Sequence, residues 1–322
     1  MSTEATSRQI VLGTRGSDLA MYQARLVAWA LQTQHVDLSV KIKKIVTSGD
    51  KILDSPLSRI GDKGLFVKEI EMALLDGEID LAVHSSKDLP TILPDELTIG
   101  AFGKREDPRD VFLGKAKSLL EIPAGGRIGT SSLRRRSQLL ALRPELDIVD
   151  IRGNVDTRIA KIEELGLDGT ILAAAGVKRL EREDRISFHF SADEMVPAVG
   201  QGVIAIEIRK DDSFTRQLVK AQNDADSADA VTAERALMRW LEGGCQVPIG
   251  AHARVSGGQL ELKAFLGSLD GTKSVRDSLE GPRGDAEQLG ETLARQLHES
   301  GGAAILEEVR REAGADGGGY WT

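Results

Sequence analysis

Basic side chains follow several predicted strands of this chain at equivalent places. Arg15 follows a short strand at 9–13, and Lys87 follows a strand that ends near Val83. In open α/β sheets, ligands bind beyond the carboxyl ends of the strands. Arginine also grips carboxylate or phosphate through paired hydrogen bonds. Convergence on one cleft would indicate a polyanionic ligand for these cations: Arg15, Lys87, Arg134, Arg135, Arg152 and Arg158.

Residues 129–136, Gly-Thr-Ser-Ser-Leu-Arg-Arg-Arg, open a predicted helix at 131–142. The amides of a helix N-terminus favour an anion. Three arginines near a helix start oppose its dipole unless an anion is present. We therefore favour an anion site over 130–135 and a solvated surface for Arg136. The spacing of an ATPase-type phosphate loop is absent from this segment.

The segment 84–88, His-Ser-Ser-Lys-Asp, also follows a predicted strand. Loops at this position are enriched in function, but a solvated surface loop has the same composition. The residues alone leave both interpretations open for Ser85, Lys87 and Asp88. His84 is typical of a structural histidine, and without a partner at metal-ligand spacing we predict no metal site.

Cys245 is the one cysteine of the chain and stands in the glycine-rich turn 243–248. Free cysteines are usually buried and inert. On an approachable loop, the thiolate can instead act as a nucleophile or a covalent anchor. The spacing favours neither interpretation.

Strands and helices alternate over residues 9–208, which predicts two α/β units built on parallel sheets. Ser17 is the predicted N-cap of a helix at 18–34. One face of that helix carries Leu19, Tyr22, Leu26 and Ala30. The polar stretch 47–64 is typical of a lid or binding loop.

The last third of the chain has a different pattern. A predicted helix at 228–241 precedes three short strands, which Gly-Gly at 257–258 and Asp-Gly at 270–271 separate as hairpin turns. Two more helices are predicted at 285–299 and 303–312. This order predicts a smaller α+β domain, followed by a tail that we expect to be mobile.

The composition narrows the class of protein. The 322 residues are 41% hydrophobic, which predicts a soluble globular protein of two or three domains. A net charge of −8 argues against nucleic acid or an anionic membrane as the main partner. A single cysteine excludes an internal disulfide and fits a reducing cytoplasm. We detect no signal peptide and no apolar run long enough to span a membrane.

Eight motifs, in order from about residue 8 to residue 309, resemble those of the porphobilinogen deaminase (hydroxymethylbilane synthase) family. They are Gly-Thr-Arg-Gly-Ser (13–17), Gly-Asp-Lys-Gly-Leu-Phe (61–66), His-Ser-Ser-Lys-Asp (84–88), Arg-Glu-Asp-Pro-Arg-Asp (105–110), Gly-Thr-Ser-Ser-Leu-Arg-Arg (129–135), Arg-Gly-Asn-Val (152–155), Ala-Val-Gly-Gln-Gly (198–202) and Glu-Gly-Gly-Cys-Gln-Val-Pro-Ile-Gly (242–250).

The resemblance implies a transferase of haem biosynthesis that deaminates four porphobilinogen molecules and joins them head to tail. The chain grows on a dipyrromethane cofactor bound covalently to Cys245 and leaves as linear hydroxymethylbilane. The implied fold has two α/β domains like those of periplasmic binding proteins, with the cleft between them, and a C-terminal α+β domain. The implied boundaries are 7–102 with 203–220, then 106–198, then 225–313, with a tail at 314–322.

The resemblance also implies roles for individual residues. Asp88 matches the catalytic aspartate, which stabilises developing positive charge on a pyrrole. The implied partners are porphobilinogen and the growing chain, held by a monomer. The implied cofactor-binding and substrate-binding residues are Arg15, Ser17, Lys63, Phe66, Ser85, Lys87, Thr130, Ser132, Arg134, Arg135, Arg152, Arg158, Arg179 and Gln201.

The chain departs from the family pattern at three residues, one of which is Arg136, an added base, and three other functions compete with the one that the resemblance implies. Ser86 replaces a frequent methionine, and Asp156 adds a negative charge near Arg152 and Arg158. The main alternative is an anion-binding protein of the periplasmic-binding-protein type. A thiol hydrolase needs a base beside Cys245, and His252 is the nearest histidine. A DNA-binding role for one triple-arginine run in an acidic chain is weaker still.

Overall fold

The computed structural model describes residues 8–51, 64–241 and 247–315. Its contacts divide the chain into two compact units. The first unit draws on Met1–Ile52, Gly64–Arg105 and Val203–Ala228, and the second includes Glu106–Gly202 and Asp229–Thr322. The second unit therefore contains both the middle sheet and the C-terminal sheet. The predicted division into three domains stays a prediction.

The first unit is built on a five-stranded sheet of order β2-β1-β3-β10-β4. β1 runs parallel to β2 and β3, whereas β10 runs antiparallel to β3 and β4. The elements of this unit are β1 (Arg8–Thr14), α1 (Asp18–Gln34), β2 (Leu38–Lys44), α2 (Ser48–Lys51), α4 (Lys68–Leu75), β3 (Leu81–Ser85), β4 (Leu97–Phe102), β10 (Ile204–Arg209) and α8 (Ser213–Val219).

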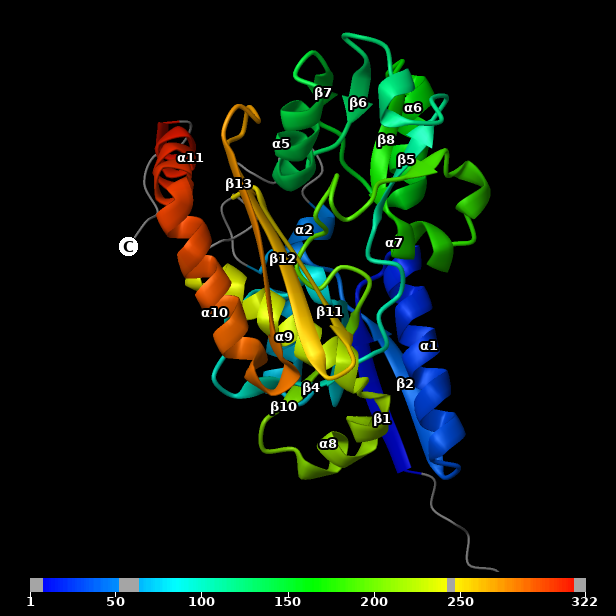
Figure 1. Cartoon of the computed structure of the whole chain (residues 1–322). Coiled ribbons are helices and arrows are strands. Elements are labelled where there is room, and N and C mark those ends of the chain that lie inside the picture. The colour runs from blue at the N-terminus through cyan, green and yellow to red at the C-terminus, as the bar shows by residue number, and fades with distance from the viewer. Residues whose placement is uncertain (1–7, 52–63, 242–246, 316–322) are drawn as a thin grey trace, which may run out of the picture. The chain divides into compact units, whose positions relative to one another are not determined.

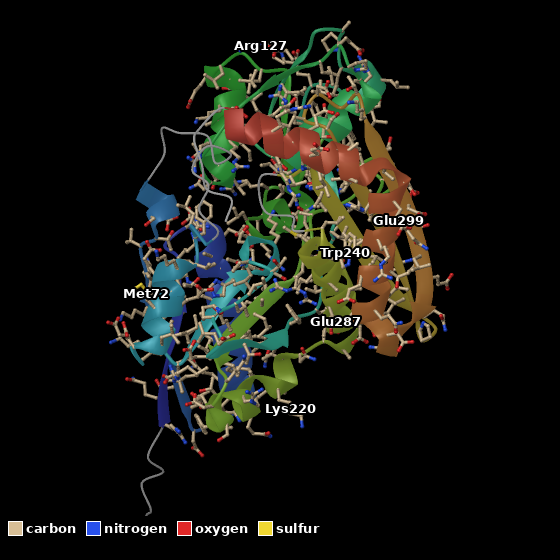
Figure 2. The ribbon with its side chains drawn as sticks, turned by 90° about the vertical axis from the view of Figure 1, so that its left-hand side faces the viewer. Met72, Arg127, Lys220, Trp240, Glu287 and Glu299 are labelled. Carbon is tan, nitrogen blue, oxygen red and sulfur yellow. The ribbon has the colours of Figure 1, made fainter. Side chains whose placement is uncertain are left out.

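Helices cover both faces of this first sheet (Figure 1). Alternation along β3 sends Leu81 and Val83 into a cluster with α1, and Ala82 into a cluster with α4. In α4, Ile70 and Leu74 are buried, whereas Met72 points outward (Figure 2). The amphipathic segment predicted at 65–75 is therefore a helix whose apolar stripe packs on the sheet.

The second unit contains a sheet with an analogous order, β7-β6-β8-β5-β9. β6 is parallel to β7 and β8, and β5 is antiparallel to β8 and β9. α5 covers one face through Leu139, and α6 covers the other through Ile159. The elements are β5 (Asp110–Gly114), β6 (Arg127–Gly129), α5 (Leu133–Leu142), β7 (Asp147–Val149), α6 (Val155–Glu164), β8 (Gly169–Ala173), α7 (Ala174–Arg179) and β9 (Phe188–His189).

The C-terminal part is a three-stranded antiparallel sheet of order β11-β12-β13, with helices packed on it (Figure 1). Gly257 and Gly258 both have positive φ, as the predicted hairpin turn requires. Gly290 lets α10 approach α9, because a Cβ atom there would lie 2.2 Å from the Ala233 carbonyl oxygen. The elements are α9 (Ala225–Trp240), β11 (Ile249–Ser256), β12 (Gln259–Gly267), β13 (Ser274–Pro282), α10 (Ala286–Leu297) and α11 (Ala303–Ala315).

These sheets confirm the α/β class and the smaller C-terminal α+β part, and they correct two expectations. The sheets are mixed rather than parallel, because β10 and β5 run against their neighbours. The face of α1 that carries Tyr22 and Leu26 is exposed, and the buried face carries Ala24, Val27 and Leu31. Within the described residues, no helix is long and apolar enough to span a membrane.

Candidate active site

A pocket in the first unit gathers predicted site residues from two neighbouring strand ends and the start of α4. Its wall comes from the turn after β1, the segment before α4 and the turn after β3. Asp88 is exposed at the end of a short 3-10 turn, 86–88, that continues β3. The predicted residues that line this pocket are Arg15, Ser17, Phe66, Ser85 and Asp88.

Arg15 holds a carboxylate of the protein. Its Nε donates to Asp50 Oδ1 at 3.1 Å, and its guanidinium carbon lies 4.2 Å from the centroid of the Phe66 ring. Burial raises the pKa of Asp50, but hydrogen bonds and charge from Arg15 outweigh it and bring that pKa below its usual range. Arg15 can therefore hold a carboxylate, and in this structure the carboxylate is that of Asp50.

Ser85 is oriented from inside the unit. The buried Gln23 of α1 donates from Nε2 to the Ser85 hydroxyl at 2.9 Å. The amide of Ser86 donates to the Val203 carbonyl at 2.9 Å, which ties the turn to the segment before β10. Lys87, like Asp88, is exposed on this turn. The strand end thus presents a hydroxyl, a cation and a carboxylate from one supported turn.

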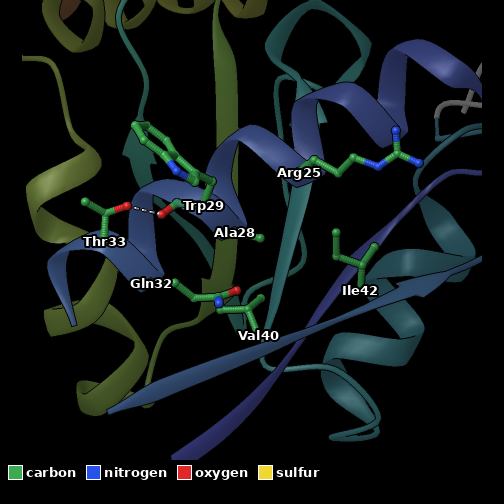
Figure 3. A pocket seen from close by; sticks show the side chains of 7 residues that line it. All are labelled: Arg25, Ala28, Trp29, Gln32, Thr33, Val40 and Ile42. Atoms are coloured by element: carbon green, nitrogen blue, oxygen red, sulfur yellow. Dashed lines mark hydrogen bonds between the residues drawn. The ribbon is translucent and has the colours of Figure 1, made fainter. Parts of the chain in front are cut away.

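A different pocket lies on the outer face of α1 and β2 (Figure 3). Trp29 is 67% exposed there, and the Thr33 hydroxyl donates to the Trp29 carbonyl at 2.8 Å. Arg25 is the one charged residue that lines this pocket. No predicted site residue borders it, so the chemistry of the predicted motifs lies elsewhere.

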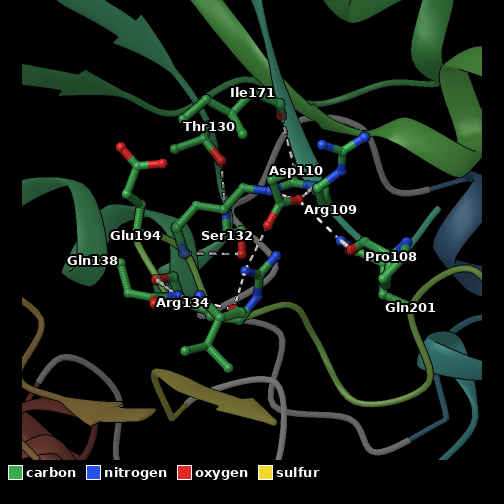
Figure 4. A network of polar contacts seen from close by, with 12 residues as sticks. Pro108, Arg109, Asp110, Thr130, Ser132, Arg134, Gln138, Ile171, Glu194 and Gln201 are labelled. Carbon is green, nitrogen blue, oxygen red and sulfur yellow. Dashed lines mark hydrogen bonds and ion pairs between the residues drawn. The ribbon is translucent and has the colours of Figure 1, made fainter. Parts of the chain in front are cut away.

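The arginines at the start of α5, where the sequence predicts an anion site, bond to Asp110, the first residue of β5 (Figure 4). Arg134 Nη1 donates to Asp110 Oδ2 at 2.7 Å. Arg135 donates to Asp110 Oδ1 from Nε at 3.0 Å and from Nη2 at 2.7 Å. Gln201 Nε2 donates to the same oxygen at 3.1 Å. One buried carboxylate therefore organises three predicted site residues.

This network carries more positive than negative charge. Two guanidiniums face one carboxylate, and the side chains of Arg134 and Arg135 are each 6% exposed. Burial raises the pKa of Asp110, but the charges of both arginines outweigh it and hold that pKa well below the usual range. An anionic ligand would balance the remaining positive charge.

The hydroxyls beside the network shape the helix start. Ser132 is the N-cap of α5 and accepts from the Arg135 amide at 3.4 Å. Thr130 Oγ1 accepts from the Ser132 amide at 3.2 Å. The remaining guanidinium contacts of Arg134 and Arg135 are to carbonyls, those of Val196 and Ile171. Both hydroxyl oxygens accept in these bonds, and their protons can be donated to an anion.

The other predicted cations of the second unit lie at element ends. Arg152 and Arg158 flank the start of α6, and Arg158 Nε donates to the Gly153 carbonyl at 2.9 Å. Arg179 Nη2 donates to the Gly202 carbonyl at 2.8 Å, beside Gln201. Asp156, the added negative charge near Arg152 and Arg158, accepts from Arg182 Nε at 3.2 Å, so Arg182 is the partner that neutralises it.

Lys63 and Cys245 lie outside the described residues, as do residues 52–63 of the predicted lid. Among the residues that the structure describes, no group of three or more His, Cys, Asp or Glu side chains is arranged to hold a metal ion. The predicted site residues that the structure describes lie at four places: at or beside the pocket that Asp88 lines, in and next to the network around Asp110, at the start of α6 and at the end of α7.

Sequence reasoning missed three residues that support this site: Asp110, Asp50 and Gln23. Asp110 stands in a quoted motif without a role, although a charged residue that opens the apolar run 111–113 is a signal of a buried ion pair. Asp50 was absorbed into the polar stretch 47–64. Gln23 is buried on α1 but is not one of the residues of the predicted apolar face.

Comparisons with known proteins decide the family. Residues 10–217 match the model described as porphobilinogen deaminase, dipyromethane cofactor binding domain, and residues 228–299 match its C-terminal domain. The chain belongs to the porphobilinogen deaminase family. The porphobilinogen deaminase of Syntrophomonas wolfei is 54% identical over 94% of this chain and 100% of its own length. That of Geobacter sulfurreducens is 51% identical over 92% and 94%.

Solved structures of binding proteins also align with this member of the porphobilinogen deaminase family. A probable amino-acid transporter extracellular-binding protein of Bacillus subtilis has a TM-score of 0.39 and 10% identity, covering 67% of this chain and 90% of its own. The aliphatic sulphonate binding protein of Escherichia coli has a TM-score of 0.39 and 11% identity over 72% and 70%.

Proposed function

We propose that this chain is a porphobilinogen deaminase that joins four porphobilinogen molecules into linear hydroxymethylbilane. Each condensation releases one ammonia, and water releases the finished chain. The observation that carries this proposal is the 54% identity with a porphobilinogen deaminase over 94% of the chain.

The cations bind the carboxylates of the substrate chain in this proposal. Each pyrrole carries an acetate and a propionate, so a growing chain accumulates negative charge. The surplus guanidinium charge around Asp110 is suited to such a ligand, because charge-assisted bonds from arginine are strong and directional. The binding residues are Arg15, Ser17, Lys63, Phe66, Ser85, Lys87, Thr130, Ser132, Arg134, Arg135, Arg152, Arg158, Arg179 and Gln201.

Asp88 is the catalytic residue of the proposal. Loss of ammonia from porphobilinogen leaves an electron-poor methylene-pyrrole, and a carboxylate near the pyrrole N–H stabilises its positive charge. The exposed position of Asp88 in the pocket leaves it open to a substrate. The same carboxylate can accept the proton that leaves after the new carbon–carbon bond forms.

The cofactor of the proposal is a dipyrromethane, joined to Cys245 by a thioether. When bound, it supplies the free pyrrole carbon from which the chain grows. The match of residues 10–217 to a dipyromethane cofactor binding domain supports this cofactor. Its carboxylates fit the described cations, because Arg15 already binds the carboxylate of Asp50. We further propose that the protein is cytoplasmic and acts as a monomer, and gel filtration at several concentrations tests the monomeric state.

Intact mass of the denatured protein tests this function. We expect a covalent excess equal to two linked porphobilinogen-derived units in the wild type and none in Cys245→Ser. Wild-type protein given porphobilinogen should also release hydroxymethylbilane. A wild type that keeps its sequence mass after incubation with porphobilinogen, and forms no product, would refute the proposal and favour the anion-binding alternative.

A further inference from the structure

Three buried ionisable side chains lie near enough to act on one another electrostatically beside the pocket of the first unit. His84 Nε2 lies 3.1 Å from Glu207 Oε2, and the two side chains are 3% and 0% exposed. Glu71 of α4 is also buried. We call His84, Glu207 and Glu71 the acid–imidazole cluster. Its members come from β3, β10 and α4, and all belong to one compact unit.

The pleat of the sheet explains why His84 and Glu207 meet. Ala82 of β3 packs against α4, so His84, two residues later, points to the same face. Glu207 lies opposite Ala82 in the antiparallel register of β3 and β10. The pairing of β10 with β4 has an irregularity, a shift of register between Ile206 and Glu207. Such irregularities commonly re-aim a side chain.

The charges of the cluster do not balance when both carboxylates are ionised. Among the described residues, Glu71 Oε1 and Glu207 Oε1 have no hydrogen-bond partner. The charged groups that act on Glu71 there are Glu207 and His84. Burial and the charge of Glu207 raise the pKa of Glu71 to about 7. A proton on Glu71 removes one of two buried negative charges and supplies a hydrogen-bond donor.

The cluster touches the proposed site directly, because His84 lines the same pocket as Ser85 and Asp88. We infer that the acid–imidazole cluster positions the turn 85–88, because His84 lies against the buried Glu207 and directly precedes that turn. A second buried negative charge, on Glu71, would disturb this arrangement, so the turn is held best while Glu71 is protonated. This inference rests on the proposed function for the role of Asp88. His84 and the two glutamates are positioning residues, since they act on the turn and not on the reacting atoms.

Glu71→Gln tests the inference, because the amide mimics the neutral carboxyl. At pH 6 we expect the variant and the wild type to have kcat/KM values within about twofold. At pH 8 a group that titrates near 7 has lost its proton in about nine molecules of ten, so the variant should exceed the wild type about tenfold. The exposed Glu78, paired with Lys43, provides the control Glu78→Gln, whose profile should follow the wild type.

Infrared spectroscopy of the purified wild type supplies a second readout that needs no turnover. We expect a carbonyl band of a protonated carboxyl that disappears near pH 7 and is missing from Glu71→Gln. A band that titrates only at ordinary carboxyl values, or a variant whose pH profile matches that of the active wild type, would overturn the inference. A wild type without activity at any pH would refute the proposed function, while the infrared titration would still test the cluster.

Discussion

Asp110→Asn is expected to destabilise the second unit strongly. The asparagine keeps the shape of the side chain but leaves Arg134 and Arg135 without their counter-charge. Removing one partner of a buried ion pair costs about 3–5 kcal/mol, because an uncompensated charge stays buried. We expect the free energy of unfolding to fall by that amount at pH 7, since Asp110 is 0% exposed.

Urea unfolding followed by circular dichroism measures this loss, and Asp156→Asn is a matched control. Asp156 also accepts from an arginine Nε, at 3.2 Å, but both side chains of that pair are nearly half exposed. Exposed ion pairs contribute about 0–1 kcal/mol. If both variants lose less than about 1 kcal/mol, the reasoning from buried charge is wrong.

The difference in unfolding free energy between the wild type and Asp110→Asn depends on pH in a way that follows from the lowered pKa of Asp110. Its pKa is lowered in the folded protein from an ordinary value of 3.8. A lowered carboxyl pKa stabilises the fold above the unfolded value, and this contribution is lost as the pH falls through the folded value. The difference between wild type and Asp110→Asn should therefore stay constant from pH 8 to pH 5 and narrow only in strong acid.

Two further predictions concern the proposed catalysis and a helix cap. Asp88→Asn should lower kcat at least about 100-fold with little change in KM, because the amide cannot take up a proton; steady-state kinetics with less than a tenfold loss would contradict the role of Asp88. Asn154 caps α6 by accepting from the Thr157 amide at 2.9 Å. Asn154→Ala should cost about 1 kcal/mol in urea unfolding and Asn154→Gly only a few tenths, and equal losses would contradict the capping argument.

The helix α1 shows how far sequence patterns reach. The helix runs from Asp18 to Gln34 as predicted, and the bond from the Ala20 amide to the Ser17 hydroxyl confirms Ser17 as its N-cap. The predicted apolar face is wrong, because Tyr22 and Leu26 are exposed while Gln23 is buried. Gln23 is buried since it bonds to Ser85, 62 residues away. Local periodicity cannot anticipate a polar residue whose partner comes from another strand.

Strand direction was a second limit of the sequence. Alternating strands and helices predict parallel sheets, but β10 enters the first sheet after the whole second sheet has formed along the chain. Its apolar residues have the same pattern in either direction, and only the path of the chain decides. β5 was missed for a related reason: it is a short apolar run that opens with the charged Asp110.

Arg15 and Arg135 illustrate why a list of cations does not by itself define a binding site. Each binds a carboxylate of the protein, but the side chains of Arg15 and Asp50 are 23% and 25% exposed. Water reaches part of Asp50, so in the proposed function a ligand carboxylate would displace Asp50 at a lower cost than it would displace the wholly buried Asp110. Arg135 binds the wholly buried Asp110 and the Ile171 carbonyl. Leaving these partners would leave a buried charge unpaired, so in the proposed function we expect Arg135 to attract a ligand by its charge while it stays bonded to Asp110.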